Sequence, residues 1–159
     1  MPYMNPLRAK DPYDWSALLR LIRTSFAYMD GRIDPPSSMH QLTVDTLKQT
    51  ADTCEIWVIE DRSTPVACVF LTPKDNILYL GKLAVASTHR GRGYARALIA
   101  KAEERAADLD LTEVELHTRV ELFENHTTFA AMGFLQCDEF THDGFDHPTS
   151  IVFRKKIPA

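Results

Sequence analysis

Residues 78–107 contain, in this order, an apolar segment, a turn with two glycines and a long amphipathic segment. The apolar segment, Leu78–Val85, has the composition of a buried strand. Between Ala95 and Ala106 the apolar residues recur with the 3.6-residue period of a helix that buries one face. The chain is therefore expected to be organised around a strand that passes directly into a helix through the turn Ser87–Gly93.

The turn before this helix has the features of an anion-binding site. Gly91 and Gly93 let the backbone approach a ligand closely and adopt angles that other residues avoid. The first turn of a helix has N–H groups without partners, and the helix dipole attracts negative charge to that end. Arg90, Arg92 and Arg96 add positive charge. We interpret the turn as a seat for a diphosphate; the alternative is a glycine-rich turn with solvated arginines.

The sequence of this turn differs from two common phosphate-binding motifs and resembles a third. Arg96 occupies the position of the third glycine in the dinucleotide-binding pattern G-x-G-x-x-G, and no Walker A sequence occurs. The run Arg90–Ala95, RGRGYA, instead resembles motif A of the GCN5-related N-acetyltransferases, the GNAT superfamily, whose pattern is Q/R-x-x-G-x-G/A. The preceding Leu83–Val85 is similar to the fourth strand of that family.

Periodicity and turn residues predict the remaining elements in the order β-α-α-β-β-β-α-β-α-β-β. The expected strands are 3–9, 55–60, 66–71, 78–85, 113–120, 135–140 and 150–155, and the expected helices are 15–28, 37–50, 94–107 and 125–132. This order matches the GNAT fold, so the resemblance extends over nearly the whole chain. It implies an α/β (α+β) domain with a mixed, mostly antiparallel sheet of six to seven strands and about four flanking helices. In that fold a V-shaped splay between the fourth and fifth strands admits the pantetheine of acyl-CoA.

Composition limits the other possibilities. The 159 residues suit a single domain, residues 1–159, and a net charge of −4 disfavours a general nucleic-acid-binding role. Three widely spaced cysteines argue against a disulfide framework and against a zinc site. No apolar run reaches membrane-spanning length and the first residues lack the apolar core of a signal peptide, so no membrane association and a cytoplasmic location are expected.

The resemblance implies a set of residues that bind acetyl-CoA as co-substrate. Backbone groups of the fourth strand would hold the thioester and pantetheine, although the same residues also read as strand core. Amides of the turn would hold the diphosphate, and a polar residue of the last helix would lie near pantetheine. The implied cofactor-binding residues are Leu83, Ala84, Val85, Arg90, Gly91, Arg92, Gly93, Tyr94, Ala95, Arg96, Asn125 and Phe129. For Asn125 the alternative is a helix N-cap.

His117 is the expected general base. The segment Glu113–Val120 alternates, with Glu115, His117 and Arg119 on its polar face. By resemblance, His117 occupies the place of a glutamate that deprotonates the amine in several family members, and an imidazole titrates near neutral pH. The alternative is a structural histidine that is hydrogen-bonded to a neighbour.

Phe129 departs from the family pattern. The run Phe129–Phe134 resembles Y-x-x-x-G-F, in which the tyrosine is often the acid that protonates the departing thiolate. A phenylalanine has no proton to donate. The thiolate would then leave unassisted or take a proton from another residue, for which Tyr94, Thr127 and Thr128 are the candidates.

The acceptor pocket is expected beside the loop between the first two helices. Asp30 and Asp34 lie in this loop and would suit a cationic amine, although a solvated acidic loop is the alternative. Between the last two strands lies a loop with two histidines and two aspartates, His142–His147, whose spacing is unlike known zinc motifs. No metal is expected.

The leading prediction is an acetyl-CoA-dependent N-acetyltransferase that transfers acetyl to a primary amine by direct attack. No acyl-enzyme is expected, because no cysteine lies on the strand that lines the cleft. The acceptor, a small molecule or a peptide, is left open, and strands near the C-terminal end leave a homodimer open. One alternative is a non-catalytic acyl-CoA sensor of the same fold, which Phe129 favours. Another is a regulatory domain that binds an ATP-like nucleotide.

Overall fold

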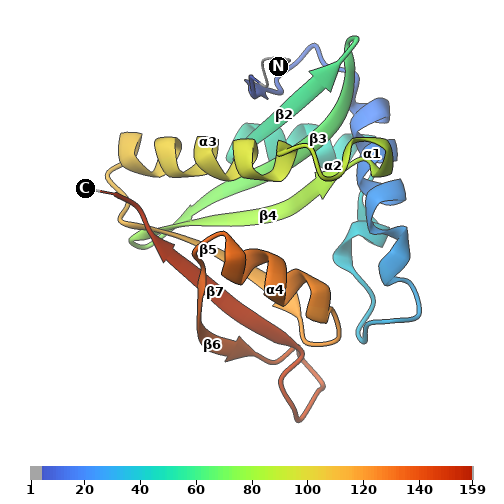
Figure 1. Cartoon of the computed structure of the whole chain (residues 1–159). Coiled ribbons are helices and arrows are strands. Elements are labelled where there is room, and N and C mark those ends of the chain that lie inside the picture. The colour runs from blue at the N-terminus through green and yellow to red at the C-terminus, as the bar shows by residue number, and fades with distance from the viewer. Residues whose placement is uncertain (1–4, 159) are drawn as a thin grey trace.

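The computed structural model describes residues 5–158 and contains one seven-stranded sheet in the order β1-β2-β3-β4-β5-β7-β6. All neighbouring strands are antiparallel except β4 and β5, which are parallel (Figure 1). The strands are β1 (Leu7–Arg8), β2 (Glu55–Asp61), β3 (Thr64–Lys74), β4 (Ile77–Val85), β5 (Glu113–Arg119), β6 (Leu135–Phe140) and β7 (Ser150–Lys156). The helices are α1 (Trp15–Phe26), α2 (Val44–Thr53), α3 (Tyr94–Asp108) and α4 (Phe123–Ala131), with short 3-10 helices η1 (Ala27–Met29), η2 (Ser38–Gln41) and η3 (Ser87–His89). The mixed sheet and four helices confirm the predicted fold class.

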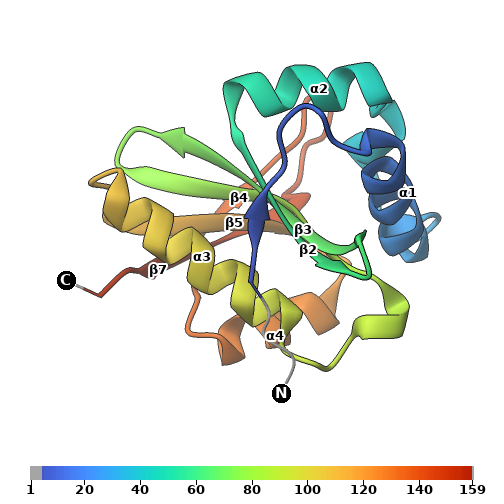
Figure 2. The same cartoon turned by 90° about the horizontal axis from the view of Figure 1, so that it is seen from above.

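Helices cover both faces of the sheet and form two apolar cores. One core joins α3 to β3, β4 and β5, and the other joins α1 and α2 to β2 and β3. Viewed from above, α1 and α2 lie on one side of the sheet and α3 on the other (Figure 2). Strand β3 is buried continuously from Pro65 to Leu71, because side chains on both of its faces meet a helix layer.

The parallel pair β4 and β5 separates part-way along its length. Paired residues run only from Ile77 opposite Glu113 to Leu80 opposite Leu116, although both strands continue beyond this point. In the same stretch β4 contains a β-bulge, where Lys82 and Leu83 together face the single residue Val69 of β3. Bulges bend a strand and increase its twist. The V-shaped splay expected from the resemblance is therefore present (Figure 1).

Several element boundaries differ from the predictions, among them the strand expected at 66–71, which extends over Thr64–Lys74, and the first helix, which ends at Phe26 rather than at residue 28. The helix expected from residue 37 begins at Val44, because Thr43 forms a capping box with Thr46 and so starts a new helix after η2. The helix expected at residue 125 begins earlier, at Phe123, with Leu122 at its N-cap. The strand expected at 3–9 is reduced to Leu7–Arg8, and residues 3 and 4 lie outside the described part of the chain.

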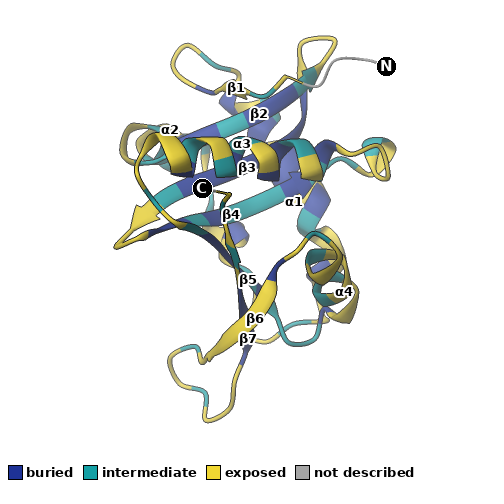
Figure 3. Cartoon of the chain, turned by 60° about the vertical axis from the view of Figure 1, so that its left-hand side comes forward, coloured by how far each residue is buried: buried dark blue, intermediate teal, exposed yellow. Residues whose placement is uncertain are grey.

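The C-terminal side of the sheet is open to solvent. All six residues of β6 are exposed, and Leu135 is 74% exposed (Figure 3). The homodimer left open by the sequence stays a prediction. Within residues 5–158, no helix combines the length and the apolar character needed to cross a bilayer.

A partly buried ion pair joins α3 to β2. Arg105 donates from Nε and Nη2 to the two carboxylate oxygens of Glu55, at 2.8 and 2.9 Å, and the Glu55 side chain is 11% exposed. The guanidinium of Arg105 holds the pKa of Glu55 below its ordinary value. Because the folded state lowers this pKa, the stabilisation is present above the pKa of the unfolded chain and is lost as the pH falls through the folded value.

We expect Glu55→Gln to lower the free energy of unfolding at neutral pH by about 1–3 kcal/mol, since it removes hydrogen bonds to a charged group. The deficit should shrink on acidification, which urea unfolding at a series of pH values will measure. Glu104→Gln is the control, because Glu104 pairs with Lys101 at the surface with 61% of its side chain exposed. Equal losses in the two variants would contradict the assignment.

Candidate active site

The start of α3 presents backbone N–H groups that have no partner. Gly93 is the N-cap residue, with φ +86°, and no side chain caps the helix. Gly91 also adopts a positive φ, +75°. Within residues 5–158, no acceptor lies within hydrogen-bonding distance of the N–H groups of Tyr94, Ala95 and Arg96. N–H groups arranged in this way can bind an anion, and the diphosphate seat expected from the sequence stays a prediction.

A cavity of about 640 Å³, here called the α3 cavity, lies between this helix start, β4, α1 and α4. It brings together most of the expected cofactor-binding residues, while Arg92 lies outside its lining. The expected residues in the lining are Leu83, Ala84, Val85, Arg90, Gly91, Gly93, Tyr94, Ala95, Arg96, Asn125 and Phe129. Residues that the sequence did not indicate also line it, among them Ser25, Tyr28 and His89.

A second cavity of about 430 Å³, here called the β5 cavity, lies between β4, β5 and the segment that follows α1. His117 lines it. The two cavities share part of their lining, so they meet where β4 and β5 separate. The shared residues are Phe26, Tyr28, Leu83, Asn125 and Phe129.

His117 is held in one orientation by its neighbours. Its Nε2 lies 3.0 Å from Oε1 of Glu115, whose other carboxylate oxygen accepts a 2.6 Å hydrogen bond from Nε of Arg154. The Glu115 side chain is 8% exposed, and the Tyr79 ring meets the imidazole edge-on. A carboxylate at Nε2 favours the tautomer with the proton there, which leaves Nδ1 as an acceptor. No partner of Nδ1 occurs in the described chain.

Asn125 and Tyr28 are joined where the cavities meet. Nδ2 of Asn125 donates to the hydroxyl oxygen of Tyr28 at 3.2 Å. The N-cap alternative for Asn125 is wrong, because Leu122 occupies that position. Phe129 packs edge-on against Phe134, as an apolar wall. The sequence offered one signal for Tyr28, an aromatic hydroxyl at the end of the first helix and next to the expected acceptor loop.

The two loop aspartates are placed away from the cavities. Asp30 pairs with His40 at 2.7 Å on the surface, and the backbone N–H of Asp34 donates to Glu121. Neither residue is part of either lining, so the solvated-loop alternative describes them. The same loop instead contributes Met29 and Ile33 to the β5 cavity.

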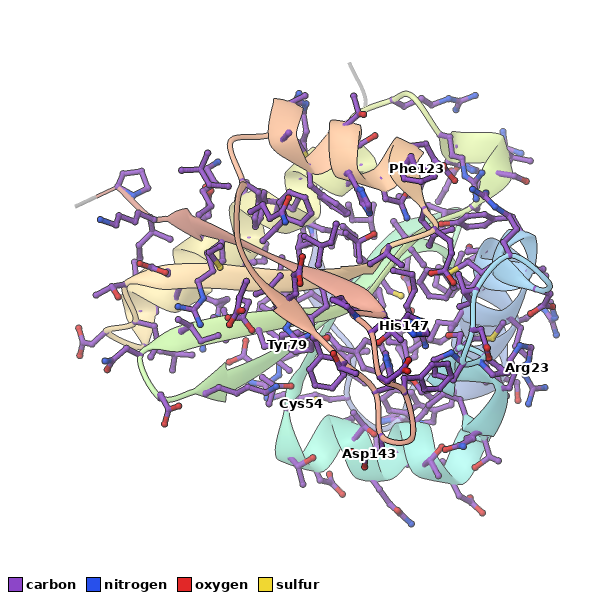
Figure 4. All side chains as sticks on the ribbon, turned by 90° about the horizontal axis from the view of Figure 1, so that it is seen from below. Arg23, Cys54, Tyr79, Phe123, Asp143 and His147 are labelled. Carbon is purple, nitrogen blue, oxygen red and sulfur yellow. The ribbon has the colours of Figure 1, made fainter. Side chains whose placement is uncertain are left out.

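The loop between β6 and β7 carries no metal-binding cluster. His142 lines the β5 cavity and bonds Thr149 through Nδ1, while His147 and Asp146 form an exposed pair. Figure 4 shows Asp143 and His147 in this loop and Tyr79 on β4. Between residues 5 and 158, no group of three or more His, Cys, Asp or Glu side chains is arranged to hold a metal ion.

Comparison with known families decides what kind of protein carries this site. Residues 15–134 match the model of the Acetyltransferase (GNAT) family, which is more than half of the chain. The chain belongs to the GNAT acetyltransferase family. No curated protein matches the sequence.

Solved structures of GNAT acetyltransferases have the same fold at low sequence identity. The PaiA N-acetyltransferase of Thermoplasma acidophilum, solved in complex with coenzyme A, is 14% identical, with a TM-score of 0.80 and coverage of 97% of this chain and 99% of that one. A GNAT family acetyltransferase of Elizabethkingia anophelis with acetyl-CoA bound is 13% identical, with a TM-score of 0.68 and coverage of 98% and 99%. A spermidine N-acetyltransferase SpeG chimera from Vibrio cholerae and hSSAT is 18% identical, with a TM-score of 0.74 and coverage of 96% and 95%.

Membership in the GNAT family agrees with the arrangement of the two cavities. One contains the helix start with free N–H groups, and the other contains an imidazole that is held by a buried carboxylate. The aromatic residues Phe26, Tyr28 and Phe129 lie between them. An acyl donor and an acceptor that entered from opposite sides would meet at these residues.

Proposed function

We propose that the protein is an acetyl-CoA-dependent N-acetyltransferase that acts on a primary amine by direct attack. The observation that carries the proposal is the junction of the α3 and β5 cavities at the splay of β4 and β5. Such a junction holds two substrates in attack geometry, which lowers the barrier of a bimolecular reaction substantially.

The α3 cavity suits coenzyme A because its groups match the parts of that molecule. The free N–H groups of Tyr94, Ala95 and Arg96 fit the diphosphate, and Arg90 and Arg96 add positive charge. Beyond Leu80 the edge of β4 that faces β5 has no strand partner, so its backbone groups are available to pantetheine. Bound acetyl-CoA supplies the thioester carbonyl that the amine attacks.

In the proposed reaction the amine nitrogen forms a bond to the carbonyl carbon, and the carbon–sulfur bond then breaks. The amine must lose a proton, which Nδ1 of His117 accepts directly or through water. Glu115 is a positioning residue in this scheme, because its carboxylate binds Nε2 and stabilises the imidazolium that forms. The coenzyme leaves as a thiolate, which is protonated to the thiol.

Tyr28 takes the role of proton donor that Phe129 cannot fill. Its oxygen accepts a hydrogen bond from Asn125, so its own proton remains available, and its side chain lines both cavities. Among the candidates expected from the sequence, Thr127 lines neither cavity and Thr128 donates to the carbonyl of Glu124 within α4. Tyr94 lines the α3 cavity alone, whereas Tyr28 lines both cavities.

We expect Tyr28→Phe to lower kcat by roughly 10-fold, less than the 10²–10⁴ typical of general acid catalysis, because a thiolate is already a good leaving group. Release of free thiol under saturating substrates measures the change. Tyr13→Phe is the control, since the Tyr13 hydroxyl bonds Glu60 outside both cavities. An unchanged kcat for Tyr28→Phe would remove Tyr28 from the mechanism.

The experiment that tests the proposed function pairs a coenzyme A titration with a thiol-release assay over a panel of primary amines. Binding of coenzyme A together with turnover of at least one amine supports the enzyme. Tight binding without turnover of any amine supports the sensor, which Phe129 favours. A preference for ATP over coenzyme A in competition would reject both.

A further inference from the structure

The side chains of the β5 cavity have an unbalanced charge. Its lining contains the basic side chains Lys74, Lys82 and Arg119 and the imidazoles of His117 and His142. No aspartate or glutamate is part of this lining. A cavity that is built to receive an amine would be expected to offer the opposite charge, so the basic residues call for another explanation.

Lys82 reaches the cavity from the β-bulge of β4. Its backbone has a φ of +51°, a conformation that non-glycine residues seldom adopt and that often marks a functional position. Its Nζ has one neutral partner, Oγ of Ser38 at 2.7 Å, and within residues 5–158 no carboxylate lies within ion-pairing distance of it. Burial, together with the nearby charge of Arg119, lowers the pKa of Lys82.

Arg119 faces the same cavity from β5 and also has neutral partners. Its Nη1 and Nη2 donate to the carbonyl oxygens of Pro35 and Pro36, at 2.7 and 3.3 Å. Burial lowers its pKa, and the nearby charges of Glu121 and Asp34 oppose that shift without reaching ion-pairing distance or joining the cavity lining. Partly buried cations without a counter-ion are unfavourable, and an anion that binds between them reduces the cost.

We propose that the acceptor amine also carries an anionic group, a carboxylate or a phosphate monoester, which Lys82 and Arg119 bind. The proposal rests on the proposed acetyltransferase function and names its acceptor class. Arg119 lies two residues after His117 on β5, which places the two side chains on one face and about 6.6 Å apart along the strand. A short amino acid spans such a distance, with its anionic group at Arg119 and Lys82 and its amine at His117.

The same charges disfavour an acceptor that is only cationic. A polyamine would bring two or more positive charges into a cavity whose charged side chains are basic, and the nearest carboxylate to His117, Glu115, is already bonded to Arg154. Like charges at short distance in a partly buried site repel strongly. Spermidine, which carries no anionic group, is therefore the acceptor expected to react poorly in the test.

The test compares amines that differ only in the anionic group. Thiol release with acetyl-CoA is measured for β-alanine against β-alaninamide, for O-phosphoethanolamine against ethanolamine, and for spermidine. We expect kcat/KM to be at least 10-fold higher for one anionic member than for its neutral counterpart, and the two pairs show whether carboxylate or phosphate is preferred. Turnover of spermidine or of neutral amines without this preference overturns the inference but leaves the acetyltransferase function standing.

Variants of Lys82 test whether this residue causes the preference for anionic amines. Lys82→Met keeps the apolar stem and removes the charge, and we expect the ratio of anionic to neutral kcat/KM to fall roughly 10- to 150-fold, the range for a hydrogen bond between charged groups. Lys82→Arg should restore most of the ratio. Lys48→Met, on the exposed face of α2 and outside both cavities, should leave it unchanged.

If the protein acetylates none of these amines, the proposed function is wrong, and binding measurements then test the anion site on their own. β-Alanine and O-phosphoethanolamine are titrated into the protein saturated with acetyl-CoA, with the neutral counterparts as references. Binding of an anionic amine that Lys82→Met weakens supports the anion site. Equal affinity for charged and neutral members, or no binding of either, rejects it.

Discussion

Gly93→Val is expected to lower the affinity for coenzyme A by at least about 100-fold. Gly93 has a φ of +86°, in a region that a β-branched residue avoids, so the variant must move the backbone at the start of α3. The N–H groups of Tyr94, Ala95 and Arg96 then no longer converge on one anion, and several hydrogen bonds to charged oxygens are lost together. Calorimetric titration with coenzyme A measures the loss directly.

A matched variant tests whether backbone strain alone could explain such a loss. Gly144 has the same φ, +86°, in the loop between β6 and β7, and a side chain there would meet open space. Gly144→Val introduces the same strain outside both cavities and should leave coenzyme A affinity unchanged. Retained affinity in the Gly93 variant would show that the turn is not the diphosphate seat, and every role assigned from it would then be withdrawn.

His117→Gln is expected to lower kcat by about 10²- to 10⁴-fold, the usual contribution of a general base. Glutamine keeps polar atoms in place, so the hydrogen bond with Glu115 can be retained while the titrating nitrogen is lost. Thiol release under saturating acetyl-CoA and amine measures the change in kcat.

Two further variants separate catalysis from structure at His117. His147→Gln removes another histidine that is paired with a carboxylate, at an exposed site in the β6–β7 loop (Figure 4), and should not change kcat. Glu115→Gln should lower kcat by about 10-fold, since it removes the negative charge beside Nε2. Normal turnover in the His117 variant, with coenzyme A binding intact, would leave the histidine with a structural role only.

The features that the sequence predicted correctly depend on residues that are close together in the chain. The uncapped start of α3 follows from the two glycines before it, and the α3 cavity contains nearly all the residues expected to bind the coenzyme. Strand β5 alternates as expected except at Glu115, which is buried, and His117 lines a cavity between β4 and β5. Burial patterns with a short period need no knowledge of distant contacts.

The acceptor side could not be predicted, because it depends on contacts between distant segments. Asp30 and Asp34 were expected at the acceptor, yet the loop folds so that Asp30 pairs with His40 and neither lines a cavity. Lys82 lies at a β-bulge, where the pairing of β4 with β3 leaves an extra residue in β4, and its side chain lines the β5 cavity. Tyr28 accepts a hydrogen bond from Asn125, which is 97 residues away in sequence.

At the bulge in β4, the two adjacent residues Lys82 and Leu83 line different sets of cavities. Leu83 lines both cavities, so in the proposed reaction it would touch the acyl donor and the acceptor, whereas Lys82 lines the β5 cavity alone. If the acceptor binds there as proposed, exchange of the side chain at position 82 would change which molecule is modified without touching the coenzyme site. New targets could then arise in descendants of such a chain by single substitutions at this position.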